Sequence, residues 1–280
     1  RLSTAASFRE LVDVEPEPRT VLGRVADAAE FDSVSAREAE REAIDSVLGA
    51  QTGSLEPGAR KVLAILEGAM DGELPPELRS DAWVIRQNAL RLLAAVRAFY
   101  DRFDRPAGAN LVRRLEARIE TGVPEHAVGL TAIDGIGAGR GQRLAQAGLT
   151  DPDAVCAAGV SGLVEAGLGE EVARTVANQA AQLPRIEIDW GQFPESVPAG
   201  ENDMQEVTVH NEGGGARLGI RVTVNGVEMT RSVTYVADSE PVPVGVFGAD
   251  DDSLTYAVTV PVPDEPLRPV TETRTVAVRG

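Results

Sequence analysis

The sequence predicts a multidomain chain that is α-helical first and β-stranded last. Three observations lead to this prediction. Apolar residues recur at helical spacing up to about residue 129, a Gly-Ile-Gly motif then separates two short helices, and apolar and polar residues alternate from residue 185 onward. We expect a helical bundle over 1–129, a helix-hairpin-helix domain over 130–184, and a seven-stranded immunoglobulin- or fibronectin-like β-sandwich over 185–280.

Proline and glycine delimit the first helices of the predicted bundle. Ala36–Leu48 has helical spacing, and Ser33 and Ser35 precede it as candidate N-caps. A proline-containing break over 53–58 separates it from Ala59–Met70, which is apolar at helical spacing. The opening twenty residues end in an acidic, proline-containing stretch, so we expect them to attach loosely to the bundle.

A long helix is predicted from Pro75-Pro76 to about Phe103, and another from Pro106 to about Thr121. On a helical wheel of about 100° per residue, one face of the long helix is apolar and is expected to face the core. The residues of that face are Ile85, Ala89, Leu92, Leu93, Val96, Phe99 and Tyr100.

A basic stripe with one aromatic residue flanks the apolar face of this long helix. Arg79, Arg86 and Arg97 fall within roughly 20° of one another on the wheel, and Trp83 lies about 40° from Arg79. An indole between guanidinium groups suits a single strand of nucleic acid, because the ring stacks on a base while the arginines hold phosphates. The alternative is a tryptophan packed at the edge of a helix interface, with the arginines lying over it.

The next helix carries a second group of arginines, Arg113, Arg114 and Arg118. They could form another basic strip for nucleic acid. The alternative, which we favour, is that they form solvated pairs along the helix with Glu116 and Glu120.

The stretch Leu130–Leu149 indicates a helix, a hairpin and a second helix. Gly135 and Gly137 bracket Ile136, a spacing that allows a tight turn with positive φ. The turn would leave bare backbone N–H groups at the start of the second helix, where a phosphate can bind. The sequence therefore predicts contact between this hairpin and a nucleic-acid backbone.

Two arginines follow the hairpin and could clamp the same phosphate, namely Arg140 and Arg143. Against this reading, Gly139 and Gly141 weaken the start of the second helix. Units of this type also serve as plain packing connectors.

The Gly-x-Gly-helix pattern recurs in Ala166–Arg174, at Gly167 and Gly169, which suggests a paired hairpin fold. Here Glu170 and Glu171 follow at the helix start and would compete with phosphate. We therefore expect the second hairpin to be structural.

The last third of the chain alternates with period two. Asn225-Gly226 between two alternating runs is a strong signal for a two-residue hairpin. Without paired cysteines, a fibronectin-like sandwich is favoured over an antibody-like one. The seven predicted strands lie at about 185–190, 206–211, 217–224, 227–236, 243–247, 254–260 and 272–278.

The charge balance is strongly acidic, and nearly all of its basic character is arginine. The formal net charge is −17, and Lys61 is the only lysine. The acids are spread through apolar-periodic segments, which fits a proteome adapted to molar salt better than a disordered acidic tail. At such ionic strength long-range attraction to phosphate is screened, so stacking and short-range arginine contacts would have to supply affinity for nucleic acid.

Several functional classes are disfavoured by what the sequence lacks. It has neither a signal peptide nor a membrane-length apolar run, its single Cys156 excludes an internal disulfide, and His126 and His210 offer no metal cluster. We expect an intracellular, metal-free protein. The sequence also lacks a G-x-x-x-x-G-K-[ST] loop and a convincing pair of nucleophile and base. An enzymatic function is therefore disfavoured.

Three segments together resemble the C-terminal region of Ski-like superfamily-two helicases. They are Ser80–Phe103 with its early tryptophan, Leu115–Leu130, and the hairpin with its following helix. The order of bundle, helix-hairpin-helix and immunoglobulin-like sandwich resembles the Sec-sixty-three-type unit of the larger members, over essentially the whole chain. In that family the long bundle helix lines the path of the translocating strand as a ratchet, and the hairpin is implied to grip or brake the emerging strand.

The resemblance places Trp83 on the family's tryptophan. The family's arginine tends to lie two turns earlier, where this chain has Pro76, so Arg79 or Arg86 would have to replace it. The implied partners are single-stranded DNA or RNA and helicase motor domains, with protein partners through the sandwich and no membrane. The resemblance implies no cofactor in this chain, because ATP and Mg belong to the motor domains.

We therefore expect the C-terminal portion of a haloarchaeal, cytoplasmic DNA helicase of DNA repair, which binds nucleic acid but does not unwind it alone. The rival expectation is a scaffold, whose sandwich and bundle dock protein partners or regulate a motor. The resemblance allows both.

Overall fold

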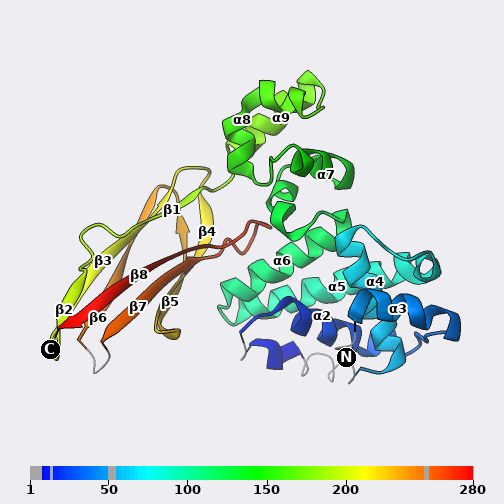
Figure 1. Cartoon of the computed structure of the whole chain (residues 1–280), viewed down its shortest axis with the longest axis horizontal. Helices are drawn as coiled ribbons and strands as arrows, with labels where there is room; N and C mark the ends of the chain where they lie inside the picture. The colour runs from blue at the N-terminus through cyan, green and yellow to red at the C-terminus, as the bar shows by residue number, and fades with distance from the viewer. Residues whose placement is uncertain (1–7, 13–14, 50–54, 249–251, 280) are drawn as a thin grey trace.

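The computed structural model describes residues 8–12, 15–49, 55–248 and 252–279. The chain is helical first and β-rich afterwards, as predicted (Figure 1). Its first part contains α2 (Pro18–Ala26), η1 (Ala29–Phe31), η2 (Glu38–Glu40), α3 (Arg41–Leu48), α4 (Pro57–Asp71), η4 (Pro76–Leu78), α5 (Arg79–Arg102) and α6 (Pro106–Thr121). The middle part contains η5 (Glu125–Ala132), α7 (Ala138–Gln146), α8 (Pro152–Glu165, interrupted at Gly159) and α9 (Glu170–Ala180).

The long helix α5 packs side by side with α6 (Figure 1). Its predicted apolar face is turned inward. Ile85, Ala89, Leu93 and their companions on that face are buried, while Phe99 is partly buried against the same core. Pro106 stands at the first position of α6, where its missing N–H costs no hydrogen bond.

Two predictions for the first part of the chain are wrong. The helix after residue 36 is not capped by Ser33 or Ser35, because a 3-10 turn begins after Arg37, whose backbone N–H donates to the Glu40 carboxylate at 2.8 Å. The opening segment is not loosely attached where it is described. Its apolar side chains, those of Phe8, Leu11 and Val12, are buried in the bundle core. Residues 1–7 and 13–14 of the opening segment, and residues 53–54 of the predicted break, lie outside the described residues.

Three hydrophobic cores follow one another along the chain. The first is built from the bundle helices and extends to Ile119, the second runs from Val123 to Leu183, and the third fills the β-sandwich. The division into domains at 129/130 and 184/185 stays a prediction. None of the described helices is both long and apolar enough to cross a membrane.

The β-rich part forms two sheets that enclose the third core (Figure 1). One sheet has the order β1-β3-β6 and the other β2-β8-β7-β4-β5; β2 pairs with β8 in parallel, and the remaining pairs are antiparallel. The strands are β1 (Ile186–Asp189), β2 (Ser196–Pro198), β3 (Asn202–Asn211), β4 (Ala216–Val224), β5 (Val227–Val236), β6 (Ser239–Phe247), β7 (Ser253–Val260) and β8 (Val270–Arg279).

All seven predicted strand segments are extended in the structure, and the short strand β2 is an eighth. The hairpin at Asn225-Gly226 is confirmed. Both residues have positive φ, 48° and 80°, and Val224 pairs with Val227 across the turn. These angles fit the type of two-residue turn whose twist matches that of the flanking strands.

A buried amide joins the bundle to the sandwich. The Asn110 side chain on α6 is fully buried, and its Nδ2 donates to the carbonyls of Val262, Glu265 and Leu267 at 2.8, 3.0 and 2.9 Å. These carbonyls belong to the segment between β7 and β8, which reaches across to α6 (Figure 1). Beside it Gly219 of β4 leaves no room for a side chain, because an added Cβ would lie 2.3 Å from Pro106.

We expect Asn110→Ala to destabilise the chain by about 2–4 kcal/mol, since several carbonyls buried at the seam would lose their donor. Urea unfolding followed by circular dichroism measures this. Asn178→Ala, at an exposed position of α9, is the matched control and should change stability by less than about 0.5 kcal/mol. Equal unfolding free energies for the two variants would contradict the role given to Asn110.

Candidate nucleic-acid interface

The first turn of α5 is fixed by a buried lysine. The Lys61 ammonium on α4 is 1% exposed and lies 2.9 Å from the Glu40 carboxylate and 2.5 Å from that of Asp81. Burial lowers the pKa of Lys61, but the two carboxylates outweigh it and raise that pKa overall. Burial raises the pKa of Glu40, and the Arg37 N–H and the Lys61 ammonium reverse the effect, so that this pKa ends below its ordinary value. The charged network therefore ties the first turn of α5 to α4 and η2.

Trp83 lies one turn into α5 and points into solvent. Its side chain is 72% exposed, and the neighbouring Val84 is 55% exposed. A tryptophan packed at the edge of a helix interface would be mostly covered, so that alternative does not describe this side chain. An exposed indole on a rigid helix is unusual, because tryptophan is highly buried on average in folded proteins.

The three arginines of the stripe differ in what they contact. Arg79 is exposed, and its Nε donates to the Leu74 carbonyl at 3.2 Å. Arg86 reaches the last turn of α6, where its Nη2 donates to the carbonyls of Ile119 and Glu120. A cation at this place satisfies carbonyls that have no partner within their own helix. Arg86 therefore joins α5 to α6.

Arg97 also faces α6. Its Nε donates to the Glu116 carboxylate at 3.2 Å, and the Glu116 side chain is only 7% exposed. Burial raises the pKa of Glu116, and the nearby guanidinium groups of Arg97 and Arg113 partly offset this. Of the stripe, Trp83 and Arg79 are thus the residues that face solvent, while Arg86 and Arg97 also brace the helix pair.

The second group of arginines is paired, but only Arg113 pairs along the helix with a predicted partner. Arg113 lies 3.7 Å from Glu116, whereas Arg114 and Arg118 lie 2.6 and 3.3 Å from Glu125, which is beyond the end of α6. The side chains of Arg114 and Arg118 are only 14% and 12% exposed, so they are not solvated pairs along one helix. Burial lowers the pKa of Arg114, partly offset by Glu125. For Arg114 and Arg118, tertiary contact with η5 replaces the expected local pairing.

The first hairpin has a 3-10 helix, η5, as its first arm and α7 as its second. Gly135 has the positive φ of 81° that the turn needs, whereas Gly137 has a φ of −95° that other residues also adopt. Ile136 is 4% exposed and packs into the second core. Gly137 precedes α7 without a side-chain cap, so the first N–H groups of that helix remain available to an anion.

The two arginines of α7 brace the hairpins. Arg140 Nη1 donates to the Gly135 carbonyl at 2.7 Å, inside the first hairpin, and Arg143 Nη1 donates to the Gly167 carbonyl at 2.9 Å, in the second. Both side chains are exposed. Sequence spacing predicted their nearness to the turn, but it gave no signal that Arg143 links the two hairpins.

The hairpin and Trp83 are connected through the end of α6. Arg86, less than one turn after Trp83, bonds the last turn of α6, and Val123 just beyond it packs on Gly141 of α7. A Cβ at Gly141 would lie 2.8 Å from Val123, which explains a glycine inside this helix. Within the residues that the structure describes, three or more His, Cys, Asp or Glu side chains do not gather to form a metal site.

Helices followed by two β-sheets define an α-then-β class of chain. The chain belongs to the family of the Sec63 Brl domain, whose family model matches residues 1–266. Membership in this family is consistent with the accessory unit of a Ski-like helicase. The comparison with curated proteins gave no match.

Three solved structures that match the chain resemble it only weakly. The CARDB domain of a Pyrococcus furiosus protein, crystallised in complex with di-metal ions, is 19% identical with a TM-score of 0.31, over 34% of this chain and 89% of that one. The solution NMR structure of the same domain is also 19% identical, with a TM-score of 0.29, over 35% of this chain and 96% of that one. The Pseudomonas fluorescens alkylpurine DNA glycosylase AlkC, bound to DNA containing an abasic site analogue, is 13% identical, with a TM-score of 0.23, over 98% of this chain and 99% of that one. Likenesses at these scores carry no functional argument.

We expect Glu40→Gln to destabilise the folded chain by about 1–3 kcal/mol at neutral pH, because Lys61 loses a buried charged partner. The folded pKa of Glu40 lies below its ordinary 4.5, so its contribution is present above that pH and is lost as pH falls through the folded value. Urea unfolding at a series of pH values should show the difference from wild type shrinking below pH 4.5.

Glu38→Gln is the control for this prediction, because Glu38 lies two residues away and its side chain is 82% exposed. It should leave the unfolding free energy nearly unchanged at every pH. A Glu40→Gln effect of the same size at acid and neutral pH would show that the charge network does not act as described.

Proposed function

We propose that this chain is the C-terminal accessory, nucleic-acid-binding region of an ATP-dependent Ski-like DNA helicase and guides a single strand of nucleic acid. Membership in the Brl-domain family supports association with helicase motor domains. Those domains would bind ATP and Mg and drive translocation. This chain would bind the strand without unwinding a duplex by itself.

The observation that carries the proposal is the exposure of Trp83. A side chain that is 72% exposed on a helix leaves most of its ring accessible to a base. Base–aromatic stacking contributes roughly 1–3 kcal/mol per base and works for every base, as a strand guide requires. Arg79, exposed one turn earlier, is placed to pair with a phosphate of the same strand.

The strand would continue from α5 to the first hairpin. Arg86 and Arg97 would contact it with the donors that are not engaged on α6, since a guanidinium carries five N–H groups. At the hairpin, the uncapped N–H groups after Gly137 and the exposed Arg140 and Arg143 would hold a further phosphate. Gly135, Ile136 and Gly137 form the turn that would present these groups to the strand.

The acidic charge of the chain fits this mode of binding. With a formal net charge of −17, long-range attraction to phosphate is absent, so a stacked indole and close arginine contacts must provide affinity. Such a surface suits a haloarchaeal cytoplasm at molar salt, where screening removes long-range repulsion as well.

A docking scaffold is the second candidate, and the surface of the sandwich favours it. β5 is an edge strand of its sheet and carries the exposed side chains of Val227, Met229 and Tyr235, with Met204 exposed on β3. Exposed apolar side chains on an edge strand are a feature of protein-binding surfaces. In this role the sandwich would recruit protein partners to a helicase motor.

We expect Trp83→Ala to weaken binding of a labelled single-stranded oligonucleotide by about 1–3 kcal/mol, as one base stack is lost. Fluorescence anisotropy in molar potassium chloride measures this, with DNA and RNA oligonucleotides compared. Tyr235→Ala removes an aromatic side chain that is 69% exposed on the sandwich, and it should bind as wild type does.

Equal binding by wild type and Trp83→Ala would reject the stacking role and leave the hairpin as the contact. Arg140→Gln would then be the variant that lowers affinity. Failure of wild type to bind DNA or RNA would reject the strand guide and leave the scaffold.

A further inference from the structure

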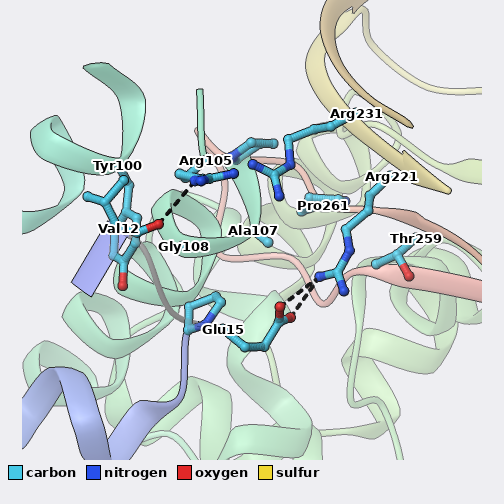
Figure 2. Close-up of a pocket in the computed structure, with 12 residues that line it drawn as sticks. Val12, Glu15, Tyr100, Arg105, Ala107, Gly108, Arg221, Arg231, Thr259 and Pro261 are labelled. Atoms are coloured by element: carbon cyan, nitrogen blue, oxygen red, sulfur yellow. Dashed lines mark hydrogen bonds and ion pairs between the residues drawn. The ribbon is translucent and has the colours of Figure 1, made fainter. Parts of the chain in front are cut away.

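A cavity of about 140 Å³ lies at the seam between bundle and sandwich, on the side away from the hairpins. We call it the seam pocket. Its walls come from the turn between α5 and α6, from the outer face of the five-stranded sheet, and from Val12, Glu15 and Pro16, which precede α2 (Figure 2). It is large enough for several water molecules, each of which occupies roughly 30 Å³ in the liquid, and therefore for one phosphate group.

Three arginines from separate elements line the seam pocket: Arg105 before α6, Arg221 on β4 and Arg231 on β5. Glu15 is its one lining carboxylate within the described part of the chain. Outside the wall, Glu228 pairs with Arg231 and lies 3.4 Å from Arg221 Nε. Three arginines against these two carboxylates leave an excess of one formal positive charge here, whereas the whole chain has a net charge of −17.

Glu15 marks the place of an oxyanion in the seam pocket. Both of its carboxylate oxygens accept from Arg221 Nη1, at 2.7 and 3.0 Å, as Figure 2 shows. The Glu15 side chain is itself 67% exposed, so packing does not hold it there. Arg105 Nε donates to the Val12 carbonyl at 3.0 Å, and the two terminal nitrogens of this guanidinium have no partner among the described residues.

We propose that the seam pocket binds a phosphate group, which takes the place of the Glu15 carboxylate on Arg221. A phosphate carries more charge and more acceptor oxygens than a carboxylate, and several guanidinium forks can bind it at once. The Thr259 hydroxyl on the pocket wall adds a neutral donor. The phosphate would bridge α6, β4 and β5 across the seam that Asn110 closes.

Isothermal titration of the whole chain with inorganic phosphate, at constant potassium chloride concentration, tests the proposal. We expect saturable binding of one phosphate per chain. Glu15→Gln should tighten binding by about threefold or more, because the competing carboxylate is gone, and Arg231→Gln should weaken it by about tenfold or more. Arg174→Gln, at an exposed site on α9, is the matched control and should bind as wild type does.

Absence of saturable phosphate binding in both wild type and Glu15→Gln would overturn the proposal, as would equal binding by Arg231→Gln and Arg174→Gln. Circular dichroism confirms that each variant is folded, and the gain expected of Glu15→Gln cannot arise from unfolding. A second arm repeats the oligonucleotide titration with Arg231→Gln. Weakened binding assigns the phosphate to a nucleic-acid backbone, and unchanged binding assigns it to a small molecule.

Discussion

The arrangement of the chain depends on one buried carboxamide. Asn110 lies on the helix that also carries the contacts of Arg86 and Arg97 to the long helix, and it holds the segment between β7 and β8 through three carbonyls. A carboxamide suits this position because it can donate to several backbone oxygens without adding a buried charge. Because α6 begins at the seam pocket and ends where Arg86 of the proposed strand path contacts it, the same helix positions both.

Arginine does much of the joining between elements. Arg86 caps the end of α6, Arg143 links the two hairpins, and Arg217 on β4 reaches Asp101 at 2.9 Å and Asp264 at 2.8 Å. A guanidinium can hold two or three acceptors in fixed directions, which an ammonium on a flexible stem does less well. The same property leaves donors over for a ligand, so an arginine can brace the fold and still face a phosphate.

The sequence predicted what periodicity and turn chemistry encode. Helical spacing placed the buried face of α5, Pro106 placed the start of α6, and Asn225-Gly226 placed a hairpin between two strands. Strand β2 was not predicted, because it has three residues with a single buried side chain, that of Val197, and so shows no periodicity. The burial of the opening segment was not predicted, because it depends on few apolar residues whose partners on α5 are distant in sequence.

The sequence predicted on which side of α5 the candidate site residues lie, but not which residues they contact. A helical wheel gives the angle of Arg79, Arg86 and Arg97 around their own axis, but it does not show that a helix end or a buried carboxylate lies opposite two of them. It also does not give exposure, and exposure is what separates Trp83 from an ordinary interface tryptophan. Pairing of Arg114 and Arg118 with Glu125 depended on the fold of η5 beyond their helix.

The burial of Lys61 has a consequence for the chemistry of the surface. The chain has one lysine, and its ammonium is 1% exposed between two carboxylates. Acylating reagents need an accessible, deprotonated amine, and burial together with a raised pKa denies them both. The folded chain therefore offers no lysine side chain for amine-selective labelling or cross-linking, and acylation at this position would report that the bundle had opened.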